Sequence, residues 1–171
     1  MRKIVLGLAI TLDGFIEGPN GEYDWCFSDQ DYGMKDFLES VDAVLYGRKS
    51  YELMMNWEGG NPFANKKSYV FSNSWTDGSD QFELVSGNVI EKVKDLKASN
   101  GKDIWLFGGA SLTTSLMNNN MVDELWLSVH PIILGKGKPL FSELSNRVKL
   151  ELVEAKPYET GLMSLRYRIV K

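Results

Sequence analysis

Two adjacent glycines, Gly108 and Gly109, stand where a short apolar run gives way to a helical pattern. The run over 103–107 is bulky enough for a buried strand, and Leu112 and Leu116 recur at the spacing of one helix face. Glycines at such a turn let the backbone approach a ligand, and the helix that follows offers free N–H groups to an anion. The segment is typical of a pyrophosphate site, although a tight strand-to-helix turn also uses glycines for steric reasons alone.

A second strand-to-helix junction carries basic and hydroxyl groups. The residues that follow Gly47 are Arg48, Lys49 and Ser50. A guanidinium, an ammonium, a hydroxyl and free helix N–H groups all suit phosphate oxygens. The alternative is a capped helix whose basic side chains are simply solvated.

A third turn, with Ser72 and Asn73, ends another apolar strand. Ligands of open α/β sheets bind beyond the carboxyl ends of the strands. We therefore expect the three turns to line one crevice.

Composition limits the classes of protein that fit. The chain has 171 residues, a net charge of −4 and no basic stripe, so it lacks the electrostatic footprint of a nucleic-acid binder. No apolar run approaches the roughly 20 residues that cross a bilayer. The single cysteine, Cys26, excludes an internal disulfide, and the single histidine, His130, excludes a His-rich metal site. We expect a soluble, cytoplasmic protein without a metal, in which His130 has a structural or rim role.

Strands and helices must alternate to position these turns, which indicates an α/β layered domain. No shift in composition suggests a linker, so residues 1–171 are predicted to form one domain. The predicted strands are 4–11, 43–46, 69–72, 82–85, 103–107 and 124–129, and the predicted helices begin near Asp29 or Asp31, at Ser50, at Val89 and after Gly109. The loop over 13–21 is predicted to be long and flexible.

The last part of the chain has a different pattern. Apolar and polar residues alternate over 148–153 and again over 163–170, across a turn at 158–161. A period of two predicts an antiparallel hairpin with one solvated face.

Taken together, the segments 12–14, 47–52, 107–112 and 123–141 resemble, in order and spacing, the dihydrofolate reductase superfamily. Within it, the chain is most similar to the reductase domain of the bifunctional riboflavin-biosynthesis deaminase/reductase and its small stand-alone relatives. The resemblance spans nearly the whole chain. It implies a dihydrofolate-reductase-like mixed, mostly parallel sheet flanked by helices, with a C-terminal antiparallel hairpin, an NADPH site and a homodimer.

The resemblance also implies roles for individual residues. Three sets would contact NADPH: the helix start of Arg48, Lys49 and Ser50, the strand end of Ser72 and Asn73, and the pyrophosphate turn of Gly108, Gly109, Ala110, Ser111 and Leu112. Asp13 and Gly14 match the loop that lies over the nicotinamide and the substrate in the family. This assignment agrees with the interpretation of the turns given above.

The catalytic carboxylate of dihydrofolate reductases has no unambiguous match here. Asp29, Asp31 and Asp36 all stand near the start of the first helix, and Asp31 has the best spacing to Gly47. Acids at a helix start also interact favourably with its dipole, which is the structural alternative. Asp31 and Asp13 are the predicted catalytic residues.

A lysine-containing loop leaves the substrate open. Lys136 and Lys138 could hold a substrate phosphate, or they could be solvated. We expect an NADPH-dependent reductase that transfers a hydride to a pteridine- or ribosylaminopyrimidine-type substrate. The alternative is a non-catalytic nucleotide-binding or sensing module on the same fold. A dinucleotide dehydrogenase with the G-x-G-x-x-G pattern ranks below both, because that pattern is missing.

Overall fold

The computed structural model describes all 171 residues, Met1–Lys171. The strands are β1 (Ile4–Thr11), β2 (Phe15–Glu17), β3 (Val41–Gly47), β4 (Lys67–Phe71), β5 (Glu83–Val85), β6 (Asp103–Gly108), β7 (Glu124–His130), β8 (Lys138–Pro139), β9 (Leu150–Pro157) and β10 (Met163–Ile169). The helices are α1 (Met34–Ser40), α2 (Arg48–Met55), α3 (Val89–Ala98) and α4 (Ala110–Asn118).

Eight strands form one sheet in the order β5-β4-β3-β6-β1-β7-β10-β9. All neighbours from β5 to β7 are parallel, whereas β10 runs antiparallel to both β7 and β9. The short strands β2 and β8 pair separately. The predicted mixed, mostly parallel sheet with a C-terminal antiparallel hairpin is therefore confirmed.

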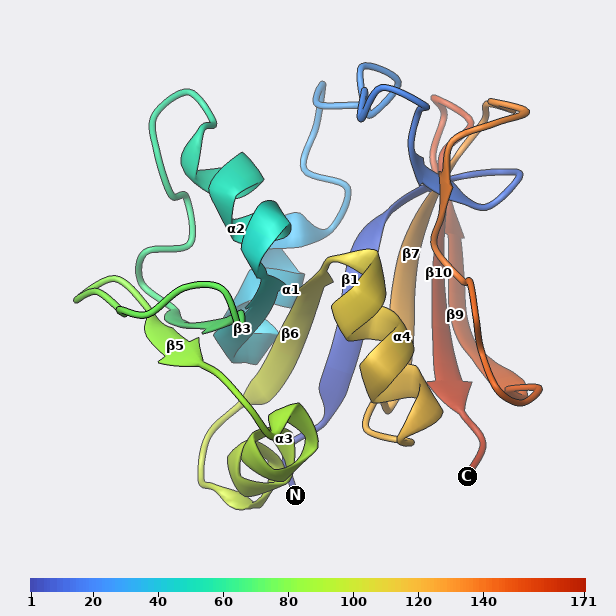
Figure 1. Ribbon diagram of the computed structural model, residues 1–171. Coiled ribbons are helices and arrows are strands. Elements are labelled where there is room, and N and C mark those ends of the chain that lie inside the picture. The colour runs from blue at the N-terminus through green and yellow to red at the C-terminus, as the bar shows by residue number, and fades with distance from the viewer.

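Helices cover both faces of the sheet. Successive side chains of a strand point to opposite faces, so the two core clusters of β1 show which helices pack on each face. In β1, Ile4 and Leu6 are buried in a core cluster that includes residues of α3 and α4, whereas Val5 belongs to a second cluster with residues of α1 and α2. Figure 1 shows α3 and α4 on the near side of the sheet and α1 behind it. The sheet is thus buried on two faces at its centre, which explains the continuous apolar runs of its central strands.

The two central strands separate toward their carboxyl ends. β1 pairs with β6 only from Ile4 to Leu6, but it continues beside β7 as far as Thr11. The Trp105 indole on β6 donates a hydrogen bond to the carbonyl of Gly7 at 2.8 Å, at the point where this pairing ends. Beyond that point the sheet leaves room for a ligand between neighbouring strands.

Three features differ from the sequence expectations. The first helix begins at Met34 rather than near Asp29 or Asp31, because Gly33 precedes it in the left-handed conformation, with φ of 86°. The predicted loop over 13–21 contains the strand β2, which pairs with β8. The hairpin strand β9 is exposed at every position, so it has two solvated faces and not one.

Candidate functional site

A cavity of about 810 Å³ opens at the carboxyl ends of the central strands. Its wall includes Leu8 and Ala9 of β1, Phe107 of β6, and Ser50 and Leu53 of α2. The loop over 23–32 contributes much of the remaining wall. Aromatic and other apolar side chains dominate the lining, as they do in most sites for small molecules.

Five phenylalanine and tryptophan rings line this cavity outside the loop over 23–32, and four of them contact one another. The centres of the Phe63 and Trp105 rings lie 4.8 Å apart, those of Trp105 and Phe107 5.2 Å apart, and those of Trp57 and Phe107 6.0 Å apart. Trp126 also lines the cavity. Such a wall favours the face of a flat ring.

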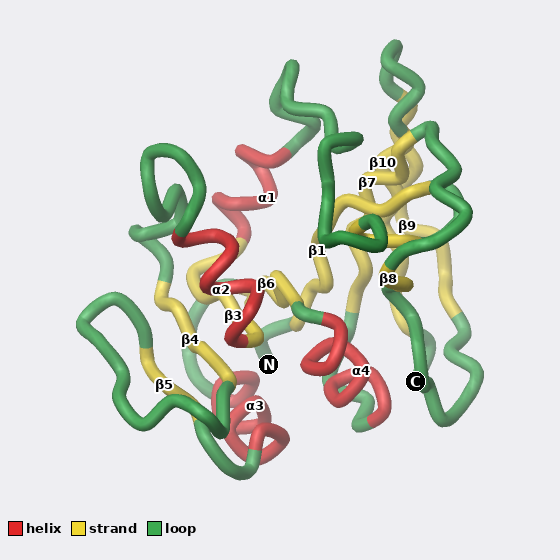
Figure 2. Tube along the Cα trace, turned by 45° about the horizontal axis from the view of Figure 1, so that its top comes forward, coloured by secondary structure: helices red, strands yellow, loops and turns green.

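The two glycine turns found in the sequence pack directly against each other. A Cβ placed on Gly47 would lie 3.2 Å from the backbone nitrogen of Gly109, and a Cβ on Gly109 would lie 3.1 Å from the hydroxyl oxygen of Ser50. Figure 2 shows α2 and α4 starting side by side after β3 and β6. The peptide bond between Gly108 and Gly109 is cis. The predicted convergence of these two turns is thus observed, and Ser50, Gly108, Gly109 and Ala110 all line the cavity.

The predicted pyrophosphate residues at the start of α4 differ in how far their side chains are exposed to solvent. Ser111 is exposed, whereas Leu112 is buried in the core cluster that includes residues of α3 and α4. The first N–H groups of a helix have no partner within it, so the backbone here can donate to an anion. Thr113, one turn inside α4, is buried on the cavity wall, and its hydroxyl has no hydrogen-bond partner.

The basic junction lies beside the third turn. Arg48 Nη1 donates to Ser74 Oγ at 2.7 Å, its Nε lies 3.3 Å from the Glu52 carboxylate, and its guanidinium carbon lies 6.0 Å from the centre of the Trp75 ring. Lys49 is exposed. The α2 start and the β4 end therefore meet, as the sequence predicted.

Ser72 and Asn73 shape that third turn. Ser72 Oγ accepts from the N–H groups of Ser74 and Trp75, and Asn73 Oδ1 accepts from the N–H of Gly87 at 3.0 Å. None of the residues of this turn lines the cavity, so the expectation that all three turns line one crevice is wrong for the third turn, which forms a separate polar margin next to Arg48.

His130 lines the cavity and holds its rim. The backbone N–H of Phe27 donates to His130 Nε2 at 3.1 Å, so that nitrogen carries no proton, and Nδ1 donates to the carbonyl of Ser128 at 2.9 Å. Burial lowers the pKa of the imidazole, and the hydrogen bond to Ser128 offsets this only in part. These contacts are those of a neutral imidazole, and they tie His130 to the loop at Phe27.

Cys26 also faces the cavity. Burial, together with the nearby Asp24 carboxylate, raises the pKa of its thiol to about 11. The thiol is thus protonated at neutral pH and is not a nucleophile, because the thiolate is the reactive form.

Asp31, the predicted proton donor, lines the cavity but also supports α1. Its Oδ2 accepts from the N–H of Gly33 and its Oδ1 from the N–H of Lys35, both at 3.0 Å. These bonds cap the first turn of the helix. The carboxylate keeps further lone pairs for a ligand, since each oxygen can accept more than one hydrogen bond.

Asp13 does not line the cavity. Its carboxylate accepts hydrogen bonds from the Thr11 hydroxyl at 2.7 Å and from the N–H groups of Leu134 and Gly135 at 3.2 and 2.8 Å. Desolvation acts in the opposite direction, but these hydrogen bonds hold the pKa of Asp13 below its usual value. The residue ties the loop after β1 to the loop before β8.

Sequence reasoning missed several lining residues. Trp57 and Phe63 belong to a connection between α2 and β4 that has no periodicity, so no signal marked them. A signal did exist for Ser128, because it follows Trp126 at an alternating position and therefore lies on the same face of β7.

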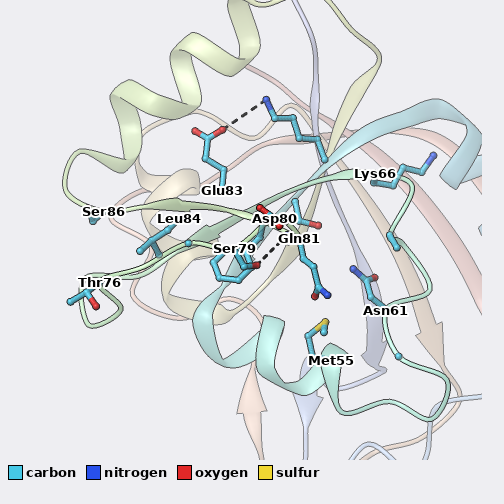
Figure 3. A pocket seen from close by; sticks show the side chains of 16 residues that line it. Met55, Asn61, Lys66, Thr76, Ser79, Asp80, Gln81, Glu83, Leu84 and Ser86 are labelled. Atoms are coloured by element: carbon cyan, nitrogen blue, oxygen red, sulfur yellow. Dashed lines mark hydrogen bonds and ion pairs between the residues drawn. The ribbon is translucent and has the colours of Figure 1, made fainter.

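A larger hollow of about 1210 Å³ lies near β4 and β5 (Figure 3). It is lined mainly by polar side chains, and it contains none of the predicted site residues. Its two lysines have partners: Lys67 pairs at 3.8 Å with Glu83, which also lines the hollow, and Lys66, which points away from the other side chains in Figure 3, donates to the carbonyl of Leu38. We therefore place the candidate site at the smaller cavity.

No group of three or more His, Cys, Asp or Glu side chains is arranged to hold a metal ion. No helix combines the length and the apolar character that crossing a membrane requires.

The sheet order and the cavity beyond its carboxyl ends define the class of dihydrofolate-reductase-like α/β proteins. Dihydrofolate reductase from Enterococcus faecalis, solved in complex with NADP(H) and RAB-propyl, superposes with a TM-score of 0.73 at 18% identity over 99% of this chain and 97% of that one. At this identity the similarity concerns the fold alone.

Within that class, the chain belongs to the RibD C-terminal domain family, whose profile matches residues 2–164. It is 44% identical to the protein YyaP of Bacillus subtilis (strain 168), over 97% of this chain and 94% of that protein. A putative riboflavin biosynthesis protein from Shewanella sp. PV-4 superposes over the full length of both chains, with a TM-score of 0.86 and 26% identity.

Proposed function

We propose that this protein is an NADPH-dependent reductase that transfers a hydride to a flat heterocycle of the pteridine or pyrimidine type. The observation that carries the proposal is the packing of the Gly47 turn against the Gly109 turn at the mouth of an aromatic cavity. Membership of the RibD C-terminal domain family and the fold of dihydrofolate reductase support it.

The residues present fit the proposed cofactor. A side chain at Gly47 would press on the backbone of Gly109, so the glycine turns keep the two helix starts close to a ligand. The free N–H groups of α4 suit a pyrophosphate, and Arg48 and Lys49 suit an additional phosphate on the adenosine side. The unpartnered hydroxyl of Thr113 offers a hydrogen bond deeper in the cavity.

Bound NADPH would supply the hydride, and the chain would supply orientation and a proton path. The aromatic wall holds the acceptor ring flat, which fixes the distance between the reacting atoms. Ile16 and Glu17 of β2 border the cavity and limit the access of water. Asp31 is the carboxyl group on this wall that we assign to the protonation step.

One observation favours a second candidate, a nucleotide-binding module without catalysis. Both oxygens of Asp31 accept backbone hydrogen bonds, which gives the carboxylate a complete structural role. In that case the cavity would bind the nucleotide and a ring without reaction.

Calorimetric titration with NADPH, followed by an assay of NADPH oxidation with a panel of pteridines and pyrimidines, tests the proposal. We expect saturable binding and oxidation with at least one acceptor. Failure to bind NADPH would overturn the proposal, whereas binding without oxidation across the panel would favour the module.

A further inference from the structure

The chain contains two Asn-Gly pairs, Asn20-Gly21 and Asn100-Gly101, and both lie in exposed connections. Asparagine before glycine is chemically labile, because the glycine nitrogen can attack the side-chain amide and no Cβ hinders its approach. The attack requires a backbone nitrogen that is free to lose its proton and a side chain that is free to turn toward it. The surroundings of each pair therefore decide which of the two reacts.

Hydrogen bonds hold the first pair within a tight turn. The N–H of Gly21 donates to the carbonyl of Gly18 at 3.0 Å, and the N–H of Asn20 donates to Glu22 Oε2 at 2.7 Å. The carbonyl of Glu22 accepts in turn from the N–H of Gly18 at 2.8 Å. The nitrogen that would attack is thus engaged, and turning it toward the Asn20 side chain would break the turn.

The second pair lacks such hydrogen bonds, although the residues on either side of it are fixed. Ser99 is bonded to the last turn of α3 through its N–H and its hydroxyl, and the N–H of Lys102 donates to Asp42 Oδ2 at 2.9 Å. Neither the side chain of Asn100 nor the N–H of Gly101 has a hydrogen-bond partner. The attacking nitrogen and the amide that it attacks are therefore both free.

We propose that Asn100 is a site of spontaneous deamidation in the folded protein. The nitrogen of Gly101 loses its proton and forms a bond to Cγ of Asn100, the bond from Cγ to Nδ2 breaks, and the amide nitrogen leaves as ammonia. Water then opens the resulting cyclic imide at one of its carbonyls. Opening at Cγ gives aspartate, whereas opening at the main-chain carbonyl gives isoaspartate, whose main chain is longer by a methylene. Nothing is oxidised or reduced.

The fold gives this modification a local consequence. A Cβ on Gly101 would lie 2.6 Å from Asp42 Oδ2 and 3.0 Å from Cζ of Arg2, so the main chain runs directly against that ion pair. Arg2 also donates from its backbone N–H to the carbonyl of Lys97 on α3, and from Nε to the carbonyl of Lys102 at 2.5 Å. A longer main chain before Gly101 would displace these contacts, which join the N-terminus to the connection between α3 and β6 (Figure 1).

The test follows both asparagines by peptide mass spectrometry while the whole protein is kept in mildly alkaline buffer, once folded and once in denaturant. In the folded protein we expect Asn100 to convert at least about fivefold faster than Asn20, which is the factor that one backbone hydrogen bond on the attacking nitrogen supplies. In denaturant both nitrogens are exposed to water, so the two rates should converge.

Three variants assign the effect. Asn100→Gln should abolish the conversion at this position, because the longer side chain would have to close a larger ring, and Asn20→Gln is the matched control that should leave the rate at Asn100 unchanged. Asn100→Asp carries the charge of the product on a normal main chain. Its thermal midpoint should stay above that of aged protein enriched in isoaspartate, because only the aged protein has a longer main chain beside Gly101.

Equal or faster conversion of Asn20 in the folded protein would overturn the inference, and so would conversion of Asn100 in denaturant alone. A thermal midpoint of the aged protein equal to that of Asn100→Asp would overturn the consequence assigned to the contacts of Arg2. These outcomes are independent of the proposed function, because neither Asn-Gly pair lines the cavity.

Discussion

Gly47 and Gly109 are in backbone contact, although they are 62 residues apart in the chain: a Cβ on Gly47 would lie 3.2 Å from the nitrogen of Gly109. Each glycine ends a strand-to-helix connection, one before α2 and one before α4. The contact brings two helix starts to one point, where the free N–H groups of both helices can face one anionic ligand.

The variant Gly109→Val should abolish nucleotide binding and leave the protein folded, because the branched side chain would fill the space beside the turn. The backbone of Gly109, with φ of −84°, is allowed for any residue, so the conflict is with Ser50 Oγ at 3.1 Å. Calorimetry for NADPH and circular dichroism for folding measure the two effects.

The double variant Gly109→Val/Ser50→Ala removes the atom that the new side chain would meet, and Ser50→Ala alone is its control, because it measures how much the loss of the hydroxyl weakens binding. Binding should remain lost in the double variant if the turn must admit a ligand. Unfolding of Gly109→Val, or normal binding by the folded variant, would mean that the glycine serves packing alone.

NADPH should bind more tightly than NADH, because Arg48 and Lys49 offer charge to the additional phosphate. Arg48→Ala should weaken NADPH by roughly ten- to a hundredfold, which corresponds to the loss of one charge-assisted hydrogen bond, and should leave NADH nearly unaffected. Calorimetry of both nucleotides measures the difference. Arg147→Ala, an exposed arginine outside the cavity lining, is the matched control. Equal affinities that do not change in Arg48→Ala would contradict the assignment.

Asp31→Asn should lower kcat at least tenfold on a verified substrate, with unchanged NADPH affinity, because a positioned acid contributes about 10²- to 10⁴-fold to the rate. Asparagine keeps one acceptor oxygen, so the variant removes the acid and retains one of the two backbone hydrogen bonds that support α1. Asp31→Ala removes both, and should also cost about 0.5–2 kcal/mol of stability in chemical denaturation. A normal rate in Asp31→Asn with a destabilised Asp31→Ala would assign the residue to capping alone.

Stability should fall as the pH drops below about 6.5, in part because of His130. The fold lowers the pKa of its imidazole, so below the unfolded value of about 6.5 the unfolded chain binds more protons than the folded one. The stabilisation is complete above that value and is lost as the pH falls toward the folded pKa. Thermal midpoints recorded across this range should decline more steeply for the wild type than for His130→Gln. Parallel profiles would show that the histidine does not titrate between the two states.

We predict a homodimer, and β9 is the surface that we assign to it. The exposed fractions of Leu150, Leu152 and Val153 on this edge strand are 41%, 54% and 47%. Exposed apolar side chains on an edge strand are typical of a surface that pairs with another chain. Sedimentation at micromolar protein should give about twice the chain mass of 19.3 kDa. Leu152→Glu should shift the protein to a monomer, whereas Leu12→Glu, in an exposed loop, should not. A monomer at all concentrations would contradict the prediction.

The parts of the fold that the sequence predicted are those governed by local patterns. The strand over 4–11 and the turn at Gly109 were found because apolar runs and glycines fix them locally. The start of α1 was misplaced because contacts far apart in the chain hold the preceding loop. The backbone N–H of Phe27 donates a hydrogen bond to His130 Nε2, and the Tyr32 hydroxyl donates to Thr160 Oγ1 at 3.1 Å.

The candidate site follows the same division. Its cofactor turns could be predicted, since each lies within one strand-to-helix connection. The aromatic wall could not, because Trp57 and Phe63 stand in an irregular connection and reach Phe107 only in the folded chain. Asp13 shows the opposite case, in which a residue of plausible chemical type is directed by the fold to the loop at 134–135.

The aromatic wall gives the protein a built-in optical reporter. The chain has five tryptophans, and three of them, Trp57, Trp105 and Trp126, line the cavity. A reduced nicotinamide ring absorbs where indoles emit, so a ring bound there would accept their excitation energy and quench their fluorescence. Cavity occupancy should therefore be visible in the emission of the unlabelled chain.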